Sequence, residues 1–128
     1  MKRKILIVED NVGLSQIQKD WLSRAGYDAV TAMSEPIARS LIRRMQFDLI
    51  LSDVRLPEGD GISLLEWLRK EKKDIPFIIT TEYVSVPDVV RTIKLGARDY
   101  LPKPVHRDYL LELAEDVFHP VATVRKQE

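Results

Sequence analysis

The chain has 128 residues, which is enough for one domain with a buried core and too few for two. Its content of 45% hydrophobic and 31% charged residues is typical of an ordinary soluble globular protein. The 20 basic and 20 acidic side chains cancel, so no global positive field favours nucleic-acid binding by this chain. The absence of cysteine excludes disulfides, thiolate metal sites and cysteine nucleophiles, and it agrees with a cytoplasmic location.

Apolar runs alternate with amphipathic stretches five times along the chain. Residues 5–8 are continuously apolar, which is typical of a strand buried on both faces. This run is too short for a signal peptide or a membrane span, so we expect no membrane association. A first helix is predicted to end near Gly26, and residues 28–32 are predicted to form a short second strand. The apolar residues at helical spacing in the first helix are Leu14, Ile17, Trp21, Leu22 and Ala25.

A second helix is predicted to begin after Ser34, which is a good N-cap, with Pro36 in the first turn. Residues 48–52 then form the third strand, and the turn-rich loop PEGDG separates this strand from a third helix. The third helix ends in the charged run RKEKKD, whose side chains we expect to be solvated. The predicted buried stripes are Ile37, Ala38, Leu41, Ile42 and Met45 in the second helix, and Ile62, Leu64, Leu65 and Leu68 in the third.

The last part of the chain contains two more strands and two more helices. Residues 76–80 are the fourth strand, residues 86–95 are a weaker helix ended by Gly96, and residues 99–101 are a short fifth strand. The final amphipathic helix has its apolar residues at Tyr109, Leu110, Leu113, Ala114, Val117 and Phe118.

This (βα)5 pattern predicts a flavodoxin-like α/β fold, in which a doubly wound, five-stranded parallel sheet has the strand order 2-1-3-4-5. We assign residues 1–120 to this domain. Residues 121–128 lose the pattern and are interpreted as a C-terminal tail or the start of a linker to an absent output domain. The carboxyl ends of parallel strands form one rim, so residues far apart in sequence are expected to converge on a crevice there.

Polar side chains follow four of the predicted strands at this rim. Glu9 and Asp10 follow the first strand, and Asp53 follows the third. Three neighbouring carboxylates repel one another unless a cation occupies the cluster, and oxygen ligands of this kind suit Mg²⁺. A carboxylate such as Asp53 can also act as a nucleophile toward a phosphoryl group. Thr81 and Lys103, after the fourth and fifth strands, could bind phosphoryl oxygens. Taken singly, each residue could instead be an ordinary loop, turn or surface residue.

The stretches VED, DLILSDVRLPEGDG, IPFIITTEY and KLGARDYLPKP, in this order, resemble the receiver domain of bacterial two-component response regulators. The resemblance covers residues 3–118, and the spacings from Asp53 to Thr81 and from Thr81 to Lys103 match as well. It implies a signalling switch rather than a metabolic enzyme, in which a sensor histidine kinase transfers a phosphoryl group to Asp53. The most similar receivers are those of transcription activators with an ATPase domain and a DNA-binding domain, which implies a transcriptional output.

The resemblance also implies how the rim residues act. Asp10, Asp53 and the backbone carbonyl of Arg55 would bind Mg²⁺ directly. Glu9 would hold a metal-bound water, and Lys103 would pair with the phosphoryl oxygens. Catalysis of phosphoryl transfer depends mainly on such positioning and charge neutralisation.

The resemblance further implies a conformational switch. Thr81 would move toward the phosphate, and Tyr100 would turn inward behind it. These movements would change the surface around the fourth helix, the fifth strand and the fifth helix, through which an output domain or a dimer partner could be controlled. The weak periodicity of residues 86–95 agrees with a mobile element in this region.

Glu82 departs from the family pattern, which usually has Ala or Gly directly after the threonine. A bulky anion at this position could crowd or repel a phosphoryl group. If Thr80 were the switch residue, Thr81 would take the small position, but the spacings to the other motifs favour Thr81.

Three alternatives to phosphoacceptance make different demands on the sequence. Glu82 is the feature that favours a phosphorylation-independent scaffold for a protein partner. A flavin-binding electron carrier would need a phosphate loop rich in glycine and hydroxyl groups after the first strand, and NVGLS is a poor one. An aspartyl-phosphate hydrolase commonly needs a second aspartate where Arg55 stands.

Overall fold

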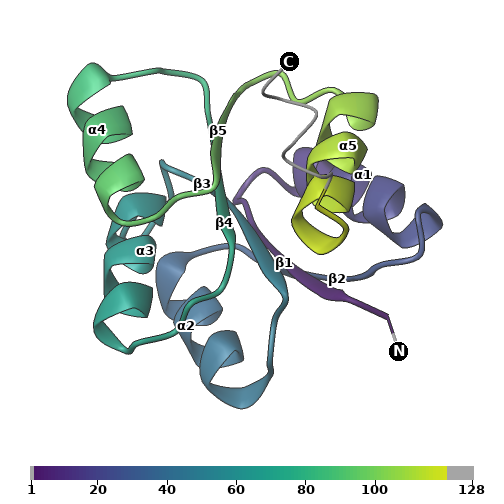
Figure 1. Cartoon of the computed structure of the whole chain (residues 1–128), viewed down its shortest axis with the longest axis horizontal. Coiled ribbons are helices and arrows are strands. Elements are labelled where there is room, and N and C mark those ends of the chain that lie inside the picture. Colours follow the sequence, from purple (N-terminus) through teal and green to yellow (C-terminus); the bar gives the residue numbers. More distant parts are fainter. Residues whose placement is uncertain (1, 121–128) are drawn as a thin grey trace.

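The structure is a computed structural model and describes residues 2–120 (Figure 1). Within this range, strands and helices alternate without exception. In chain order they are β1 (Lys4–Val8), α1 (Val12–Arg24), β2 (Asp28–Ala32), α2 (Glu35–Arg44), β3 (Leu49–Asp53), α3 (Gly61–Lys70), β4 (Phe77–Thr81), α4 (Val86–Lys94), β5 (Asp99–Pro102) and α5 (Arg107–Phe118). The tail predicted for residues 121–128 lies outside the described residues. None of the helices within residues 2–120 is long and apolar enough to span a bilayer.

The strands form one parallel sheet in the order β2-β1-β3-β4-β5, which confirms the predicted fold. Helices α1 and α5 cover one face, and α2, α3 and α4 cover the other (Figure 1). The chain moves from β1 outward to β2 and then crosses to β3 on the other side of β1. This reversal opens a crevice at the carboxyl ends of β1 and β3, where such sheets bind their ligands.

The central strands are buried on both faces, as the apolar run at residues 5–8 predicts. Leu6 and Val8 lie in the core under α2 and α3, whereas Ile5 and Ile7 lie in the core under α1 and α5. All four side chains are fully buried. The alternation follows from the pleat of the strand, because successive side chains point to opposite faces. The sheet is therefore covered by a hydrophobic core on each face.

Local sequence signals mark the start of α2 and the ends of α1 and α4, as predicted. The Ser34 hydroxyl accepts a hydrogen bond from the Ile37 N–H at 3.4 Å and caps α2. Gly26 and Gly96 follow the ends of α1 and α4 with φ of 98° and 81°, a left-handed conformation that favours glycine.

The predicted bounds of β3 and β4 were wrong by one residue. The sheet pairing continues to Asp53, which is opposite Thr80, and to Thr81, which is opposite Pro102. Asp53 and Thr81 are therefore the last residues of their strands rather than the first residues of loops. Pro76 does not open β4, and it has no N–H to donate to a neighbouring strand.

Burial on α2 also differs from the prediction. Ile37, predicted to be buried, is 47% exposed, while the preceding Glu35 is buried together with Ala38 and Ile42. Consecutive helical residues are about 100° apart around the axis, so Ile37 turns away from the side that Ala38 presents to the sheet. The buried side of α1 also differs from the prediction by one position, because Gln18 is buried and the preceding Ile17 is exposed.

Gly61 provides a test of how closely the start of α3 approaches the end of β3. A Cβ at this position would collide with the carbonyl oxygen of Asp53 and lie 2.9 Å from the Ser52 Oγ. We expect Gly61→Ala to lower the free energy of unfolding by roughly 1–3 kcal/mol in urea denaturation. Gly13→Ala is the matched control, because its Cβ would meet only the Asn11 side chain at 3.5 Å, and helix propensity favours alanine. Equal stabilities of the two variants would contradict this close approach.

Candidate functional site

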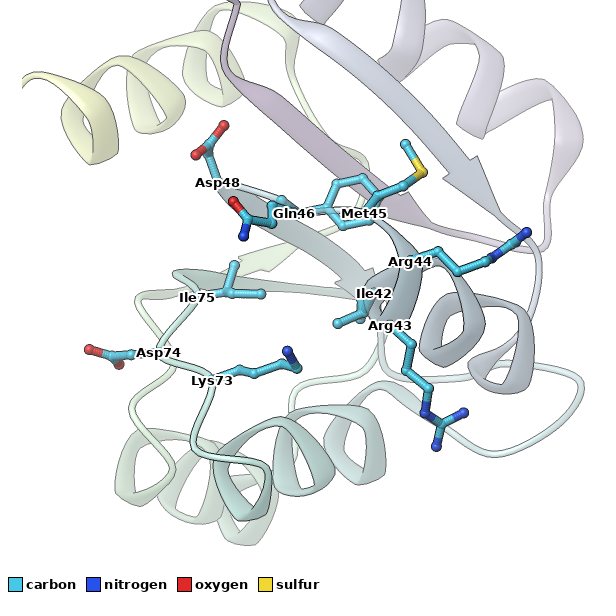
Figure 2. Close-up of a pocket in the computed structure, with 10 residues that line it drawn as sticks. Ile42, Arg43, Arg44, Met45, Gln46, Asp48, Lys73, Asp74 and Ile75 are labelled. Carbon is cyan, nitrogen blue, oxygen red and sulfur yellow. The ribbon is translucent and has the colours of Figure 1, made fainter.

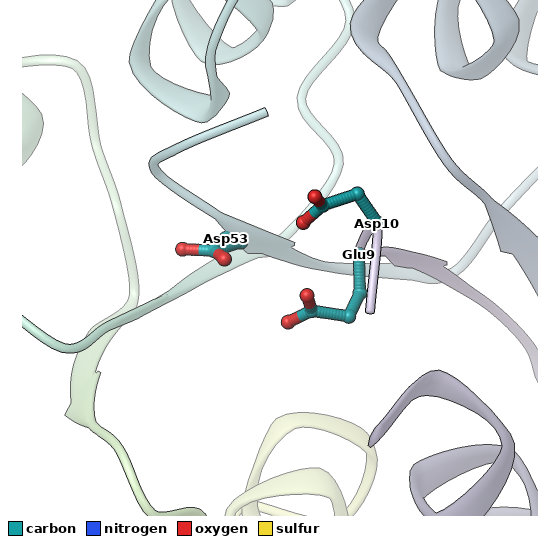
Figure 3. Close-up of side chains that lie close together, drawn as sticks. All are labelled: Glu9, Asp10 and Asp53. Carbon is teal, nitrogen blue, oxygen red and sulfur yellow. The ribbon is translucent and has the colours of Figure 1, made fainter. Parts of the chain in front are cut away.

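An acidic cluster lies at the carboxyl ends of β1 and β3. Glu9, Asp10 and Asp53 each offer one carboxylate oxygen, and these oxygens lie within 4.8 Å of one another (Figure 3). Glu9 and Asp10 directly follow β1, and Asp53 ends β3. Because β1 and β3 are hydrogen-bonded neighbours, the cluster is a direct result of the strand order.

The acidic cluster opens into a cleft of about 400 Å³. Five residues predicted for the site line this cleft together with Glu82, and they are Glu9, Asp10, Asp53, Arg55 and Lys103. A different cleft, of about 520 Å³, lies at the opposite end of the sheet, between the end of α2 and the segment before β4 (Figure 2). Its lining has mixed charge, since it includes Arg43 and Lys73 as well as Asp48 and Asp74, and it contains no residue predicted for the site.

Lys103 joins the two sides of the acidic cluster. Its ammonium lies 2.7 Å from the Glu9 carboxylate and 2.8 Å from the Asp53 carboxylate. Burial alone would lower the pKa of Lys103, but the hydrogen bonds to Asp53 and Glu9 outweigh burial and raise it above its ordinary value. The ammonium is therefore held in its charged form. The peptide bond from Lys103 to Pro104 is cis.

The two carboxylates after β1 have different surroundings. Glu9 is only 3% exposed, and burial raises its pKa. The hydrogen bonds that Glu9 accepts from Lys103 and from the Asn11 N–H partly offset this rise. Asp10 is exposed on the rim. A cation could therefore reach Asp10 from solvent, while Glu9 lies behind it.

Thr81 ends β4, the strand next to β3, but its hydroxyl does not bond to the acidic cluster. The Thr81 Oγ1 donates to the Tyr83 carbonyl at 2.9 Å and accepts from the Tyr83 N–H at 3.1 Å. The side chain is 2% exposed and does not line the acidic cleft. Among residues 2–120, no hydrogen bond joins the Thr81 hydroxyl to Asp53 or Lys103.

Tyr100 packs against the core under α2 and α3, beside Leu95 and Ala97. Its hydroxyl is buried and finds no hydrogen-bond partner among residues 2–120. Burial raises the pKa of Tyr100, and the nearby Asp88 carboxylate raises it further. The ring is therefore already turned toward the core, on the face of the sheet that α3 and α4 cover.

Sequence reasoning missed a contact between the two loops beside the acidic cluster. The guanidinium of Arg55, after β3, lies 4.5 Å from the ring centroid of Tyr83, after β4. The sequence pattern did not predict that the Arg55 side chain would contact Tyr83. The contact could have been predicted, because Arg55 and Tyr83 follow neighbouring strands and guanidinium groups are attracted to aromatic rings.

Asp10→Asn tests the repulsion within the acidic cluster. This change removes one negative charge at nearly constant size, so we expect the metal-free domain to gain on the order of 1 kcal/mol in the free energy of unfolding. Urea denaturation with a chelator, at low and high salt, measures the gain, which should shrink in high salt. Asp74→Asn, at an exposed aspartate far from the cluster, is the control. A stability at or below that of the unchanged chain would contradict the repulsion.

The chain resembles response regulators in sequence. The family described as the response regulator receiver domain matches residues 5–115. The response regulator protein PilR of Pseudomonas aeruginosa is 35% identical over 112 residues, which cover 88% of this chain and 25% of PilR. The transcriptional regulatory protein ZraR of Salmonella typhimurium is 40% identical over 114 residues, which cover 89% of this chain and 26% of ZraR. The chain thus spans about a quarter of the length of these relatives.

Solved structures agree with the sequence comparison. A CheY-like receiver domain protein from Methanospirillum hungatei has a TM-score of 0.87 and 31% identity, covering 92% of this chain and 95% of that one. The non-phosphorylated HemR receiver domain from Leptospira biflexa has a TM-score of 0.86 and 36% identity, covering 94% and 97%. The predicted resemblance is therefore confirmed, and the chain belongs to the response regulator receiver domain family.

Proposed function

We propose that this receiver domain accepts a phosphoryl group on Asp53 from a phosphohistidine of a sensor histidine kinase. The observation that supports this most is the cluster of three carboxylates within 4.8 Å, two of which contact the Lys103 ammonium. An oxygen of Asp53 would attack phosphorus, so that a P–O bond forms while the P–N bond to the donor imidazole breaks. The imidazole takes the electron pair of that bond, and its acquisition of a proton completes the transfer.

The acidic cluster fits a hard divalent cation. Its donors are all carboxylate oxygens, and three carboxylates against one ammonium leave two negative charges uncompensated. Asp10, Asp53 and the Arg55 carbonyl would hold Mg²⁺ directly, and Glu9 would hold it through a water molecule. Bound Mg²⁺ would neutralise charge that accumulates on the phosphoryl oxygens.

Lys103 and Thr81 would respond to the new phosphoryl group. The Lys103 ammonium, 2.8 Å from Asp53, would pair with a phosphoryl oxygen. Thr81 would exchange its hydrogen bonds with the Tyr83 backbone for one to the phosphoryl group. The loop before α4 would then lose the contact that fixes it, and Tyr100 would adjust behind Thr81.

The surface that would change includes α4, β5 and α5. Val86, Val90 and Ile93 of α4 are exposed by 73%, 46% and 64%. Such a stripe suits an output domain or a dimer partner that binds according to the phosphorylation state. We propose that the output is transcriptional and cytoplasmic, since ZraR is a transcriptional regulatory protein. In this proposal residues 1–120 are the receiver, and the receiver itself binds no nucleic acid and no membrane.

Glu82 supports a second candidate function. It lines the acidic cleft and adds a fourth carboxylate there. If it prevents phosphoryl transfer, the domain would instead act as a scaffold that binds a protein partner without phosphorylation.

Incubation with acetyl phosphate tests the proposed function. We expect intact mass to show one phosphoryl adduct that requires Mg²⁺ and is absent in Asp53→Asn. Asp108→Asn, at an exposed aspartate of α5, is the control that should retain the adduct. No adduct from acetyl phosphate or from histidine kinases would contradict phosphoacceptance and support the scaffold.

Glu82→Ala tests whether this side chain opposes phosphoryl transfer. Removing about 1 kcal/mol of repulsion should increase the rate of adduct formation roughly fivefold. Glu82→Gln separates the two causes, because it removes the charge and keeps the bulk. Charge repulsion predicts that both variants are faster, and crowding predicts that only the alanine variant is. An unchanged rate in both would show that Glu82 has no effect on the transfer.

A further inference from the structure

Glu35, the first residue of α2, carries a buried carboxylate outside the acidic cluster. It is 4% exposed. The Oε2 atom accepts a hydrogen bond from Arg39 Nε at 2.9 Å, and the Oε1 atom accepts one from the Asp60 N–H at 2.9 Å. A buried charge is stable only when it is paired and hydrogen-bonded, and here each oxygen has its own partner. The second of these bonds reaches from α2 to the loop that connects β3 and α3.

The tip of this loop is fitted to Glu35. The Glu35 N–H donates to the Glu58 carbonyl at 3.2 Å. Gly59 has φ of 75°, and a Cβ at this position would lie 2.8 Å from the Glu35 Cβ and collide with its carboxylate. Helix α2 therefore holds the loop through two hydrogen bonds and one close backbone approach.

The same loop carries the residues beside Asp53. Its base is closed by the Gly61 N–H, which donates to the Val54 carbonyl at 2.8 Å. Arg55 and Asp60 face each other as an antiparallel bridge across the loop. The Arg55 N–H in turn donates to the Asp53 carboxylate at 3.3 Å. A continuous series of contacts thus runs from Glu35 through Asp60 and Arg55 to Asp53.

We propose that Glu35 is a positioning residue for the phosphorylation site. The Glu35 carboxylate holds the Asp60 N–H, and Asp60 is paired with Arg55 across the loop. Glu35 thereby fixes the backbone of Arg55, both its carbonyl and the N–H that donates to the Asp53 carboxylate. This inference rests on the proposed function, because the Arg55 carbonyl matters only if a cation binds there. Outer partners of metal ligands commonly change metal affinity by 10–100-fold when they are removed.

Four variants separate positioning from general stability. Glu35→Ala removes the acceptor for Asp60, and we expect the Mg²⁺ dissociation constant to rise roughly tenfold, with a comparable loss in the rate of phosphorylation by acetyl phosphate. Arg39→Met removes the ion pair and keeps the Asp60 bond, so it should change the affinity by less than about threefold. In the double variant E35Q/R39M the amide oxygen still accepts from Asp60, and no guanidinium faces the amide nitrogen. It should rescue most of the affinity. Ile42→Ala, on the same helix, should lower the Tm without changing the affinity.

The measurements are Mg²⁺ titration by calorimetry, thermal unfolding, and the backbone amide signals of Asp53, Arg55 and Asp60 in metal-free NMR spectra. We expect these signals to shift in Glu35→Ala and to stay near their original positions in E35Q/R39M. Unmoved amide signals, or an affinity loss in Ile42→Ala equal to that in Glu35→Ala, would overturn the positioning role. If the unchanged chain binds Mg²⁺ and Glu35→Ala binds it equally well, the inference fails and the proposed function stands. If the unchanged chain neither binds Mg²⁺ nor takes a phosphoryl group, the proposed function fails, whereas the amide signals still report on the loop.

Discussion

The site depends on the ion pairs that the buried Lys103 ammonium makes with Glu9 and Asp53. Lys103 joins the end of β5 to carboxylates at the ends of β1 and β3, which are 94 and 50 residues away in the sequence. Its side chain is 9% exposed, so these ion pairs are poorly screened, and the loss of one partner would leave a buried charge unpaired. Because β3 and β5 are separated by β4, this contact requires β1, β3, β4 and β5 to be assembled in their order.

The two loops beside the acidic cluster are held in different ways. The loop after β3 is closed on itself at Gly61 and is held from outside by Glu35 of α2. The loop after β4 is held mainly by the hydroxyl of Thr81, which bonds the backbone of Tyr83, and by the stack of Tyr83 on Arg55. One wall of the cleft is thus fixed by a neighbouring helix. The other is fixed by side chains at the site itself, so a charge bound there can compete for the groups that hold it.

The sequence alone was sufficient for the strand order and for the acidic cluster, because both follow from backbone rules. Continuous apolar runs such as residues 5–8 predict buried parallel strands, and the carboxyl ends of such strands meet on one rim. Burial of Glu35 in place of Ile37 was not predictable in this way, since periodicity counts a glutamate as solvent-facing. The partners that stabilise Glu35, Arg39 and the Asp60 N–H, come together only in the folded chain. The Arg55–Tyr83 stack was missed for the same reason, as each residue alone is an ordinary loop residue.

Charge imbalance connects the stability of the domain with its proposed chemistry. Burial raises the pKa of Glu9, so ionisation of this carboxylate in the folded domain carries a desolvation cost. Lys103 offsets part of that cost, and the raised pKa of Lys103 shows that the ammonium gains from the same pairing. A folded state with a raised lysine pKa keeps this contribution from neutral pH up to the ordinary lysine pKa and loses it as the pH rises through the raised value. Near neutral pH the charge of the ammonium is therefore constant. The remaining negative charge of the three carboxylates is what a cation would neutralise. Under the proposed function, the metal-free domain would give up some stability in order to keep a site for a cation and, with it, for a phosphoryl group.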